Sequence, residues 1–422
     1  MNRSTRHRRK PSGPVLAICG SGNAGHALAV VASQNLDGDV DWLVGSEERA
    51  ELLRRGASAD GLRSTGVIEA RADKLRTISS RPEEVIPEAD LVMLVVPAFA
   101  HASVLRSVTP HVSDNTAIGC LPTRGGFEFE ASQLVRGAEG RRGRRLFGLQ
   151  TLPWSTRVVK PGEVVHVGAA KAEVLLSALP GRDGPELAGQ LSRILGTQVV
   201  AMDAFLTLTL GNPGQFIHPG LMYGAFRSWQ GEEYDNDTIP LVYAEATDET
   251  GRVVEQMSRE ALCVARAIET QSGGALDLSG VVPVHDWLQS AYSHVTADMT
   301  TVATCFRTGP IQARKAPMIE VSPGRFVPNF GYRYLSEDVP FGLVITRAIA
   351  EIVSVATPAI DEVIYWAQSN MRTAYLADGK VEGHDVRDLP IPQNYGVSTL
   401  PDLVGWYKDA TTERPQPAAE RA

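Results

Sequence analysis

The sequence predicts an α/β fold in which a doubly wound parallel sheet is followed by a mainly α-helical domain. An apolar run, Val15–Cys19, leads directly into a glycine-rich turn, as the first strand of such a sheet does. Two later runs, residues 90–97 and 116–121, are continuously apolar, which is typical of strands buried on both faces. Beyond residue 204 the apolar side chains recur with the period of a helix.

The glycine-rich turn has the spacing G-x-G-x-x-G at Gly20, Gly22 and Gly25. In a Rossmann-type fold the first glycine permits a tight turn, the second lets a pyrophosphate approach the backbone, and the third lets helix and strand pack closely. The N–H groups and the positive end of the helix dipole favour a phosphate there. The segment predicts a dinucleotide site, and its candidate residues are Gly20, Ser21, Gly22, Asn23, Ala24 and Gly25. A methyltransferase-type cofactor and a purely structural turn remain the alternatives.

The other elements are predicted in chain order from apolar runs and turn residues. We expect a strand at 39–45, a helix at 46–56, a short β segment at 66–78, a strand at 146–149, a hairpin or two further strands at 164–168 and 171–175, a helix at 185–195 and a strand at 198–202. In the second half, Thr357, Pro358 and Asp361 predict an N-cap and the first turn of a helix. The predicted organisation is a disordered basic leader at 1–14, a dinucleotide-binding domain at 15–203, an α-helical substrate domain at 204–410 and a disordered tail at 411–422.

Length and composition bound the classes of function. With 422 residues, of which 43% are hydrophobic and 21% charged, the chain is large enough for two domains of a soluble globular protein. No apolar run approaches the roughly 20 residues of a membrane span, and a net charge of -8 argues against nucleic-acid binding. The four cysteines lack the spacing of metal ligands, so we expect no metal site and a cytoplasmic location. The expected partners are small-molecule substrates, and the expected state is a monomer or homodimer.

The end of the second predicted strand bears on the cofactor. A Rossmann fold places an acidic residue about 20 residues past the glycines, where it binds the adenosine ribose. Here residues 45–49 read Gly-Ser-Glu-Glu-Arg. Glu47 suits the ribose of NAD, although an exposed helix start also explains it, and Ser46 and Arg49 equally suit the extra phosphate of NADP. The sequence therefore predicts NAD or NADP and leaves the choice open.

Loops that follow successive parallel strands meet at one edge of the sheet. Pro97, Ala98 and Phe99 stand at the end of one apolar run, and Pro122 and Arg124 follow the next. We therefore expect these five residues to flank the nicotinamide, although a plain packing role equally explains Phe99.

Two polar patches in the second half suit hydride chemistry. His218 precedes a proline inside an apolar segment, and Arg333, Glu337 and Asp338 form a polar island among aromatic residues. Reduction of a C=O or C=N bond needs a proton donor that titrates near neutral pH, a group that orients it, and a cation for the substrate carboxylate. His218, Asp338 and Arg333 supply this set. The plainer explanations are a buried, hydrogen-bonded histidine and an exposed loop with an ion pair.

With these residues the chain resembles the octopine/nopaline (opine) dehydrogenase family over about residues 15–406. The segments that carry the resemblance are 20–25, 96–101, 121–128, 151–154, 216–219, 333–340 and 393–396. The resemblance implies a Rossmann domain joined to an α-helical domain. It also implies reductive condensation of an amino acid with a 2-oxo acid, usually pyruvate, to a secondary amine dicarboxylate. By the same resemblance His218 is the acid/base residue, Asp338 fixes its tautomer, and Arg333 binds an anionic group.

Three positions depart from the pattern of the arginine-using members. Arg124 replaces a neutral amide, Gln150 replaces a glutamate, and Thr156 replaces a small thiol residue. We expect all three to contact substrate. Because the missing glutamate was the counter-charge for a guanidinium, we expect an amino donor other than arginine, either neutral or acidic. A simple 2-oxo acid or ketopantoate-type reductase and a catalytically silent NAD(P)-binding protein are the alternative functions.

Overall fold

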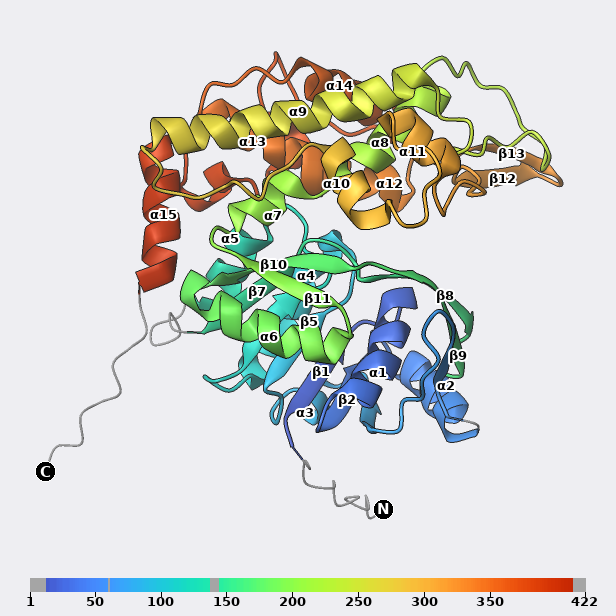
Figure 1. The fold of residues 1–422 in the computed structure, drawn as a ribbon, viewed down its shortest axis with the longest axis vertical. Coiled ribbons are helices and arrows are strands. Elements are labelled where there is room, and N and C mark those ends of the chain that lie inside the picture. The colour runs from blue at the N-terminus through green and yellow to red at the C-terminus, as the bar shows by residue number, and fades with distance from the viewer. Residues whose placement is uncertain (1–12, 60, 137–143, 413–422) are drawn as a thin grey trace, which may run out of the picture. The chain divides into compact units, whose positions relative to one another are not determined.

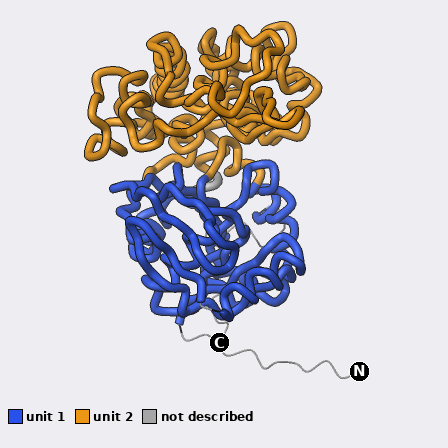
Figure 2. Tube along the Cα trace, turned by 90° about the vertical axis from the view of Figure 1, so that its right-hand side faces the viewer, with its two compact units in different colours: residues 1–122, 131–201, 413–422 blue, residues 123–130, 202–412 orange. Residues whose placement is uncertain are grey.

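The computed structural model describes residues 13–59, 61–136 and 144–412. The chain divides into two compact units, shown in Figure 2. Unit 1 comprises residues 1–122, 131–201 and 413–422, and unit 2 comprises residues 123–130 and 202–412. The predicted leader and tail lie almost entirely outside the described residues. The last helix, α15 (Leu400–Thr412), extends two residues into the predicted tail.

Unit 1 is built on an eight-stranded sheet with the strand order β11-β10-β7-β6-β5-β1-β2-β4 (Figure 1). Its strands are β1 (Val15–Cys19), β2 (Asp39–Leu43), β4 (Leu75–Ser79), β5 (Leu91–Leu94), β6 (Ala117–Cys120), β7 (Arg145–Leu149), β10 (Glu173–Leu179) and β11 (Gln198–Met202). Neighbours from β7 to β4 run parallel, whereas β10 pairs with β7 in the antiparallel sense. This sheet confirms the predicted Rossmann-type fold.

Helices connect successive strands of the sheet. They are α1 (Asn23–Asn35), α2 (Glu47–Ala59), α3 (Pro82–Val85), α4 (His101–Val108) and α6 (Gly184–Leu195). Small residues let α1 lie close to β1, since a Cβ added at Gly25 would stand 2.2 Å from the carbonyl oxygen of Gly20. The buried face of α1 joins the strands in one apolar core.

The structure corrects one predicted β element and decides between the alternatives for another. The segment 66–78 is not one strand, because β3 (Arg63–Gly66) and β4 belong to different sheets. Of the two alternatives for 164–175, the hairpin is wrong and the two separate strands are right. β9 (Val164–Ala170) pairs with β3 and β8 (Trp154–Lys160) in a three-stranded sheet, while β10 joins the main sheet.

Unit 2 is mainly helical, as predicted. Its elements are α5 (Phe127–Ala131), α7 (Leu206–Gly211), α8 (Gly214–Phe226), α9 (Asp248–Gln271), α10 (Val284–Tyr292), α11 (Val302–Thr308), α12 (Arg333–Ser336), α13 (Val344–Ile352), α14 (Pro358–Met371), α15, and the strands β12 (Met318–Ser322) and β13 (Arg325–Pro328). The long helix α9 contacts α7, α8, α10, α11, α13 and α14. Helix α8 packs tightly on it, since a Cβ added at Gly224 would stand 2.2 Å from the hydroxyl of Thr250. This packing fixes the helix that carries His218.

Residues 123–130 correct the predicted domain boundary. The prediction left them in the sheet domain, but the structure groups them with the helical unit. The N–H of Gly125 donates to the carbonyl of Phe341 at 2.8 Å, and Glu128 accepts from Thr209 and Tyr407. These long-range bonds hold Arg124 among the helices of unit 2.

Helix α14 begins where predicted, but its cap differs. Thr357 makes no capping bond from its side chain. The carboxylate of Glu260, on α9, accepts from the N–H groups of Ala359 and Ile360 at 2.9 and 3.0 Å instead. A glutamate from a packed neighbour therefore satisfies the first turn.

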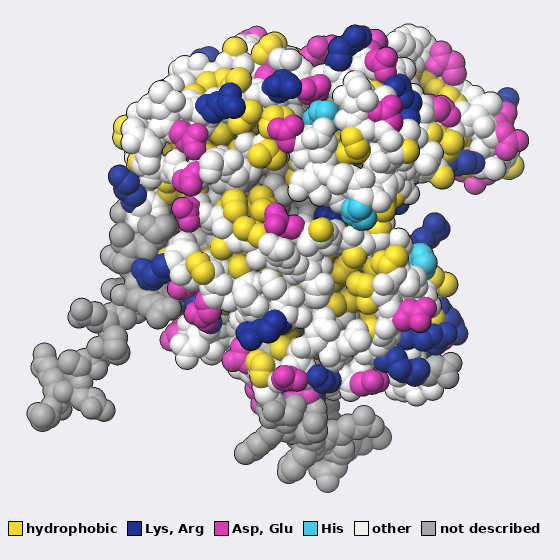
Figure 3. Space-filling view, viewed as in Figure 1, with side chains coloured by type: hydrophobic (Ala, Val, Ile, Leu, Met, Phe, Trp, Pro, Cys, Tyr) yellow, Lys and Arg dark blue, Asp and Glu magenta, His cyan; other side chains and the backbone are white. Residues whose placement is uncertain are grey.

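Acidic and basic side chains are interspersed with apolar ones over the face seen in Figure 3. Among the described residues, none of the helices combines the length and apolar character needed to cross a bilayer.

Candidate active site

The glycine turn after β1 has the shape of a phosphate cradle. Gly20 has a φ of +127°, and a Cβ there would stand 2.4 Å from the carbonyl oxygen of Val95. At Gly22 an added Cβ would meet nothing within 4 Å, so the backbone there is open to a ligand. The turn therefore fits a dinucleotide, because Gly20 packs closely against the sheet and the backbone at Gly22 is exposed to a ligand.

Two side chains that the sequence prediction missed hold this turn. The indole N–H of Trp42 donates to the carbonyl of Gly20 at 2.8 Å. Nδ1 of His26 lies 2.9 Å from the carbonyl of Gly22, and its Nε2 accepts from the N–H of Gly162 at 3.1 Å. Burial lowers the pKa of His26 to about 4, so the ring is neutral, with its proton on Nδ1. Only the position of His26 in the glycine segment hinted at this role.

Four other predicted cofactor residues of unit 1, Ser21, Asn23, Ser46 and Arg49, take part in hydrogen bonds. The side-chain oxygen of Asn23 accepts from the N–H of Val158 at 2.8 Å, which ties the start of α1 to β8. Ser21 accepts from Arg49, and Ser46 accepts from the N–H of Arg49 at 3.2 Å.

The remaining candidates of unit 1 lie within strands or just after them. Pro97 is exposed and Ala98 is buried in the short turn after β5. Gln150 is buried just past β7, and Thr156 is half-buried in β8.

In unit 2 the structure brings His218 and Asp338 together. Nδ1 of His218 lies 2.8 Å from Oδ2 of Asp338, which is fully buried, while the histidine side chain is 19% exposed. The ring of Tyr334 stacks on the His218 ring at 4.1 Å and 6°. An aspartate in this position keeps the proton on Nδ1 and leaves Nε2 as the atom for proton transfer.

Arg124 joins the same cluster. Its guanidinium is buried and lies 3.2 Å from Oδ1 of Asp338 and 3.4 Å from Oε1 of Glu337, and it donates to Oδ1 of Asn212 at 2.9 Å. Burial raises the pKa of Asp338, but the charges of Arg124 and His218 outweigh it and hold the pKa below the ordinary value. The sequence prediction placed Arg124 beside the ligands and missed these ion pairs.

Arg333 occupies the first position of α12 and its side chain is 48% exposed. Its Nε lies 3.9 Å from Oε2 of Glu337, which is a loose contact. Arg333 is therefore accessible to an anion in a way that the buried Arg124 is not.

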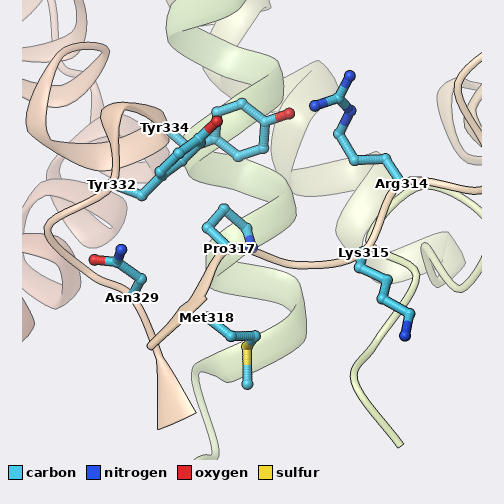
Figure 4. A pocket seen from close by; sticks show the side chains of 7 residues that line it. All are labelled: Arg314, Lys315, Pro317, Met318, Asn329, Tyr332 and Tyr334. Atoms are coloured by element: carbon cyan, nitrogen blue, oxygen red, sulfur yellow. The ribbon is translucent and has the colours of Figure 1, made fainter. Parts of the chain in front are cut away.

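A cavity of about 240 Å³ adjoins the ring that stacks on His218 (Figure 4). The residues that line it are Arg314, Lys315, Pro317, Met318, Asn329, Tyr332 and Tyr334. In Figure 4 the hydroxyl of Tyr334 points toward the guanidinium of Arg314. The lining carries two cations and no acid. Sequence reasoning noted the aromatic residues here and missed the cations. Within the described part of the chain, no group of His, Cys, Asp and Glu side chains is placed to hold a metal ion.

Comparisons with known proteins identify the family of the chain. A family model described as "NAD/NADP octopine/nopaline dehydrogenase, alpha-helical domain" matches residues 201–371. The chain is 31% identical to an opine dehydrogenase of Haliotis discus hannai over 400 residues, which cover 92% of this chain and 97% of that protein. It is 30% identical to a tauropine dehydrogenase of Arabella iricolor over 92% of this chain and all of that one.

A solved structure of an octopine dehydrogenase in complex with NADH and agmatine superimposes with a TM-score of 0.83 at 28% identity. The match covers 96% of this chain and 100% of that one. The protein is thus an NAD(P)-dependent oxidoreductase acting on CH–NH groups. By sequence and by fold, the chain belongs to the octopine/nopaline dehydrogenase family.

Proposed function

We propose that the protein reductively condenses an amino acid with a 2-oxo acid, preferably pyruvate, to a secondary amine that carries the carboxylates of both substrates. The observation that carries this proposal is the buried pair of Asp338 and His218, with Nε2 of the partly exposed histidine left for proton transfer. Condensation of the amine with the carbonyl releases water and gives an imine, and one hydride and one proton complete the reduction. The reduced nicotinamide, when bound, supplies the hydride.

The residues of unit 2 do the rest of the work in this proposal. In its charged form His218 donates a hydrogen bond from Nε2 to the carbonyl oxygen and then delivers that proton to the oxygen, which leaves as water. Such a role is typically worth about a hundred- to ten-thousand-fold in rate. Asp338 orients the ring and stabilises its charged form. Arg333, which is accessible, binds a substrate carboxylate, and Arg124 keeps Asp338 ionised.

The proposed amino donor is neutral or acidic rather than arginine. A guanidinium side chain would find Gln150 where it needs an acid. The cavity beside Tyr334 favours the acidic class, because Arg314 and Lys315 line it and no carboxylate does.

Cofactor oxidation tests this function. NADH and NADPH are each mixed with pyruvate and one of a panel of amino acids that includes arginine, aspartate, glutamate and alanine, and an amine-free reaction is the control. Oxidation that depends on the amino acid supports the proposal, and the best donor identifies the product. Equal oxidation without amine would instead indicate a simple 2-oxo acid reductase, and a preference for arginine would refute the proposed donor class.

A further inference from the structure

Two charged side chains that follow the tip of β2 point to opposite sides, Glu47 toward β4 and Arg49 toward β1. In the sheet, β2 lies between β1 and β4. The adenosine ribose of a bound dinucleotide lies between the glycine turn after β1 and the tip of β2. The side chain that points from the tip of β2 toward β1 is therefore the one that contacts the 2′ position of the ribose.

Glu47 leans the other way, toward β4. Its Oε2 accepts from the hydroxyl of Ser80 at 2.8 Å, just past the end of β4. Its Oε1 accepts from Arg54, which is itself anchored to the carbonyl of Ile78 at 2.8 Å. The bonds from Arg54 and Ser80 also lower the pKa of Glu47, which keeps it ionised and bound on that side. The acid that would hold the 2′-hydroxyl of NAD is thus engaged away from the ribose.

Arg49 leans toward β1 and the glycine turn. Its Nε donates to the hydroxyl of Ser21 at 3.3 Å, and its Nη2 donates to the carbonyl of Ser21 at 3.0 Å. These two bonds use two of the five N–H donors of a guanidinium. Among the described residues the other three make no hydrogen bond, and the turn beside them is open at both Gly22 and Gly45, where an added Cβ would meet nothing within 4 Å.

We infer that the enzyme prefers NADP(H), with Arg49 as the residue that binds the 2′-phosphate and Ser46 as its neighbour at the start of α2. NADP differs from NAD only in that phosphate, and a guanidinium fork is the side chain best suited to bind it. Ser46 already caps α2 by accepting from the N–H of Arg49, so the cation and the first turn of this 13-residue helix are held together. Glu48 is exposed, and water and salt screen its charge.

The inference names the cofactor of the proposed reaction and rests on that proposal, but its test needs no turnover. The full-length protein is titrated with NADPH and with NADH, and binding is followed by nicotinamide fluorescence. Adenosine 2′,5′-bisphosphate and AMP then compete for the site. We expect NADPH to bind on the order of 10- to 100-fold more tightly than NADH, as for a charge-assisted phosphate contact. We also expect the bisphosphate to displace it better than AMP.

Substitutions assign the preference to Arg49. Arg49→Gln should weaken NADPH binding by about the same factor and leave NADH binding within about threefold. Arg49→Lys should retain part of the preference, because the charge remains and the fork is lost. Arg55→Gln is the matched control, because Arg55 is exposed on the same helix.

Two results would overturn the inference. One is wild-type protein that binds NADH as tightly as NADPH. The other is an Arg49→Gln protein that loses affinity for both cofactors equally, which would make Arg49 only a brace for the Ser21 turn. Failure of every donor in the turnover assay would overturn the proposed reaction and would leave this binding ratio as measured.

Discussion

Glu128 offers a stability prediction that can be worked out from the structure. This carboxyl group is fully buried on α5, and its Oε1 accepts from Thr209 at 2.7 Å and from Tyr407 at 3.0 Å. Among the described residues, its Oε2 finds no hydrogen-bond partner. Burial outweighs the two hydrogen bonds and raises the pKa of Glu128 from 4.5 to about 7.

The sign of the effect follows from proton binding. Between pH 4.5 and pH 7 the folded protein holds a proton on Glu128 that the unfolded chain releases. The contribution of the protonated group to the free energy of unfolding is therefore complete below pH 4.5 and is lost as the pH rises through 7. One pKa unit corresponds to about 1.4 kcal/mol. The rise in the pKa of Glu128 to about 7 therefore lowers the free energy of unfolding by about 3 kcal/mol by pH 8.

Glu128→Gln removes this titration and keeps the size of the side chain. Urea unfolding of the wild type and the variant is measured at pH 5 and at pH 8. We expect the free energy of unfolding of the variant, relative to wild type, to rise by about 2–3 kcal/mol between the two pH values. The exposed Glu245→Gln is the matched control and should show no such change. A difference between Glu128→Gln and wild type that is the same at both pH values would refute the reasoning.

Three further predictions concern the site. His218→Ala should lower kcat by about a hundred- to ten-thousand-fold and leave the Kd for the reduced cofactor unchanged, as fluorescence titration will show; unchanged kcat would remove His218 from the mechanism. Arg124→Gln should raise the pKa of Asp338, because it removes the largest of the charges that oppose burial and leaves His218 and Arg333, and the acidic limb of the pH profile of kcat should move to higher pH. A folded variant with an unmoved limb would contradict this. Arg314→Gln should raise KM for acidic amino donors by about tenfold and leave KM for neutral donors unchanged. Equal changes in KM for acidic and neutral donors would exclude the cavity as an anion site.

The sequence predicted the fold well because local patterns encode it. Continuous apolar runs marked the central strands, and the glycine spacing marked the turn after β1. The wrong predictions concern features that depend on contacts between different segments of the chain. Nothing local shows that β9 and β10, which are close in sequence, pair in different sheets. Nor could propensity show that Glu260, about 100 residues earlier in the chain, caps α14 in place of Thr357.

The site was predicted in a similar, partial way. His218, Asp338 and Arg333 were found from residue chemistry and from the family resemblance, and the structure brings the first two into contact. The ion pairs of Arg124 join residues more than 200 positions apart, and such a separation leaves no periodic signal. The roles of His26 and Trp42 could not be predicted for another reason. Each holds the glycine turn through a hydrogen bond to a backbone carbonyl, and every residue has such a carbonyl, so the sequence does not mark the partner.

The two sets of residues are each satisfied within their own unit. Trp42 and His26 fix the glycine turn through bonds to unit 1, and Asn212, Arg124 and Asp338 fix His218 through bonds to unit 2. A buried cation that joins two carboxylates is costly to disrupt, since removal of one partner leaves charges without compensation. Hydrogen bonds and ion pairs to neighbouring residues of the same unit therefore position each set. For this reason a variant of the proton-transfer cluster can lose turnover while cofactor affinity, which depends on the other set, stays measurable.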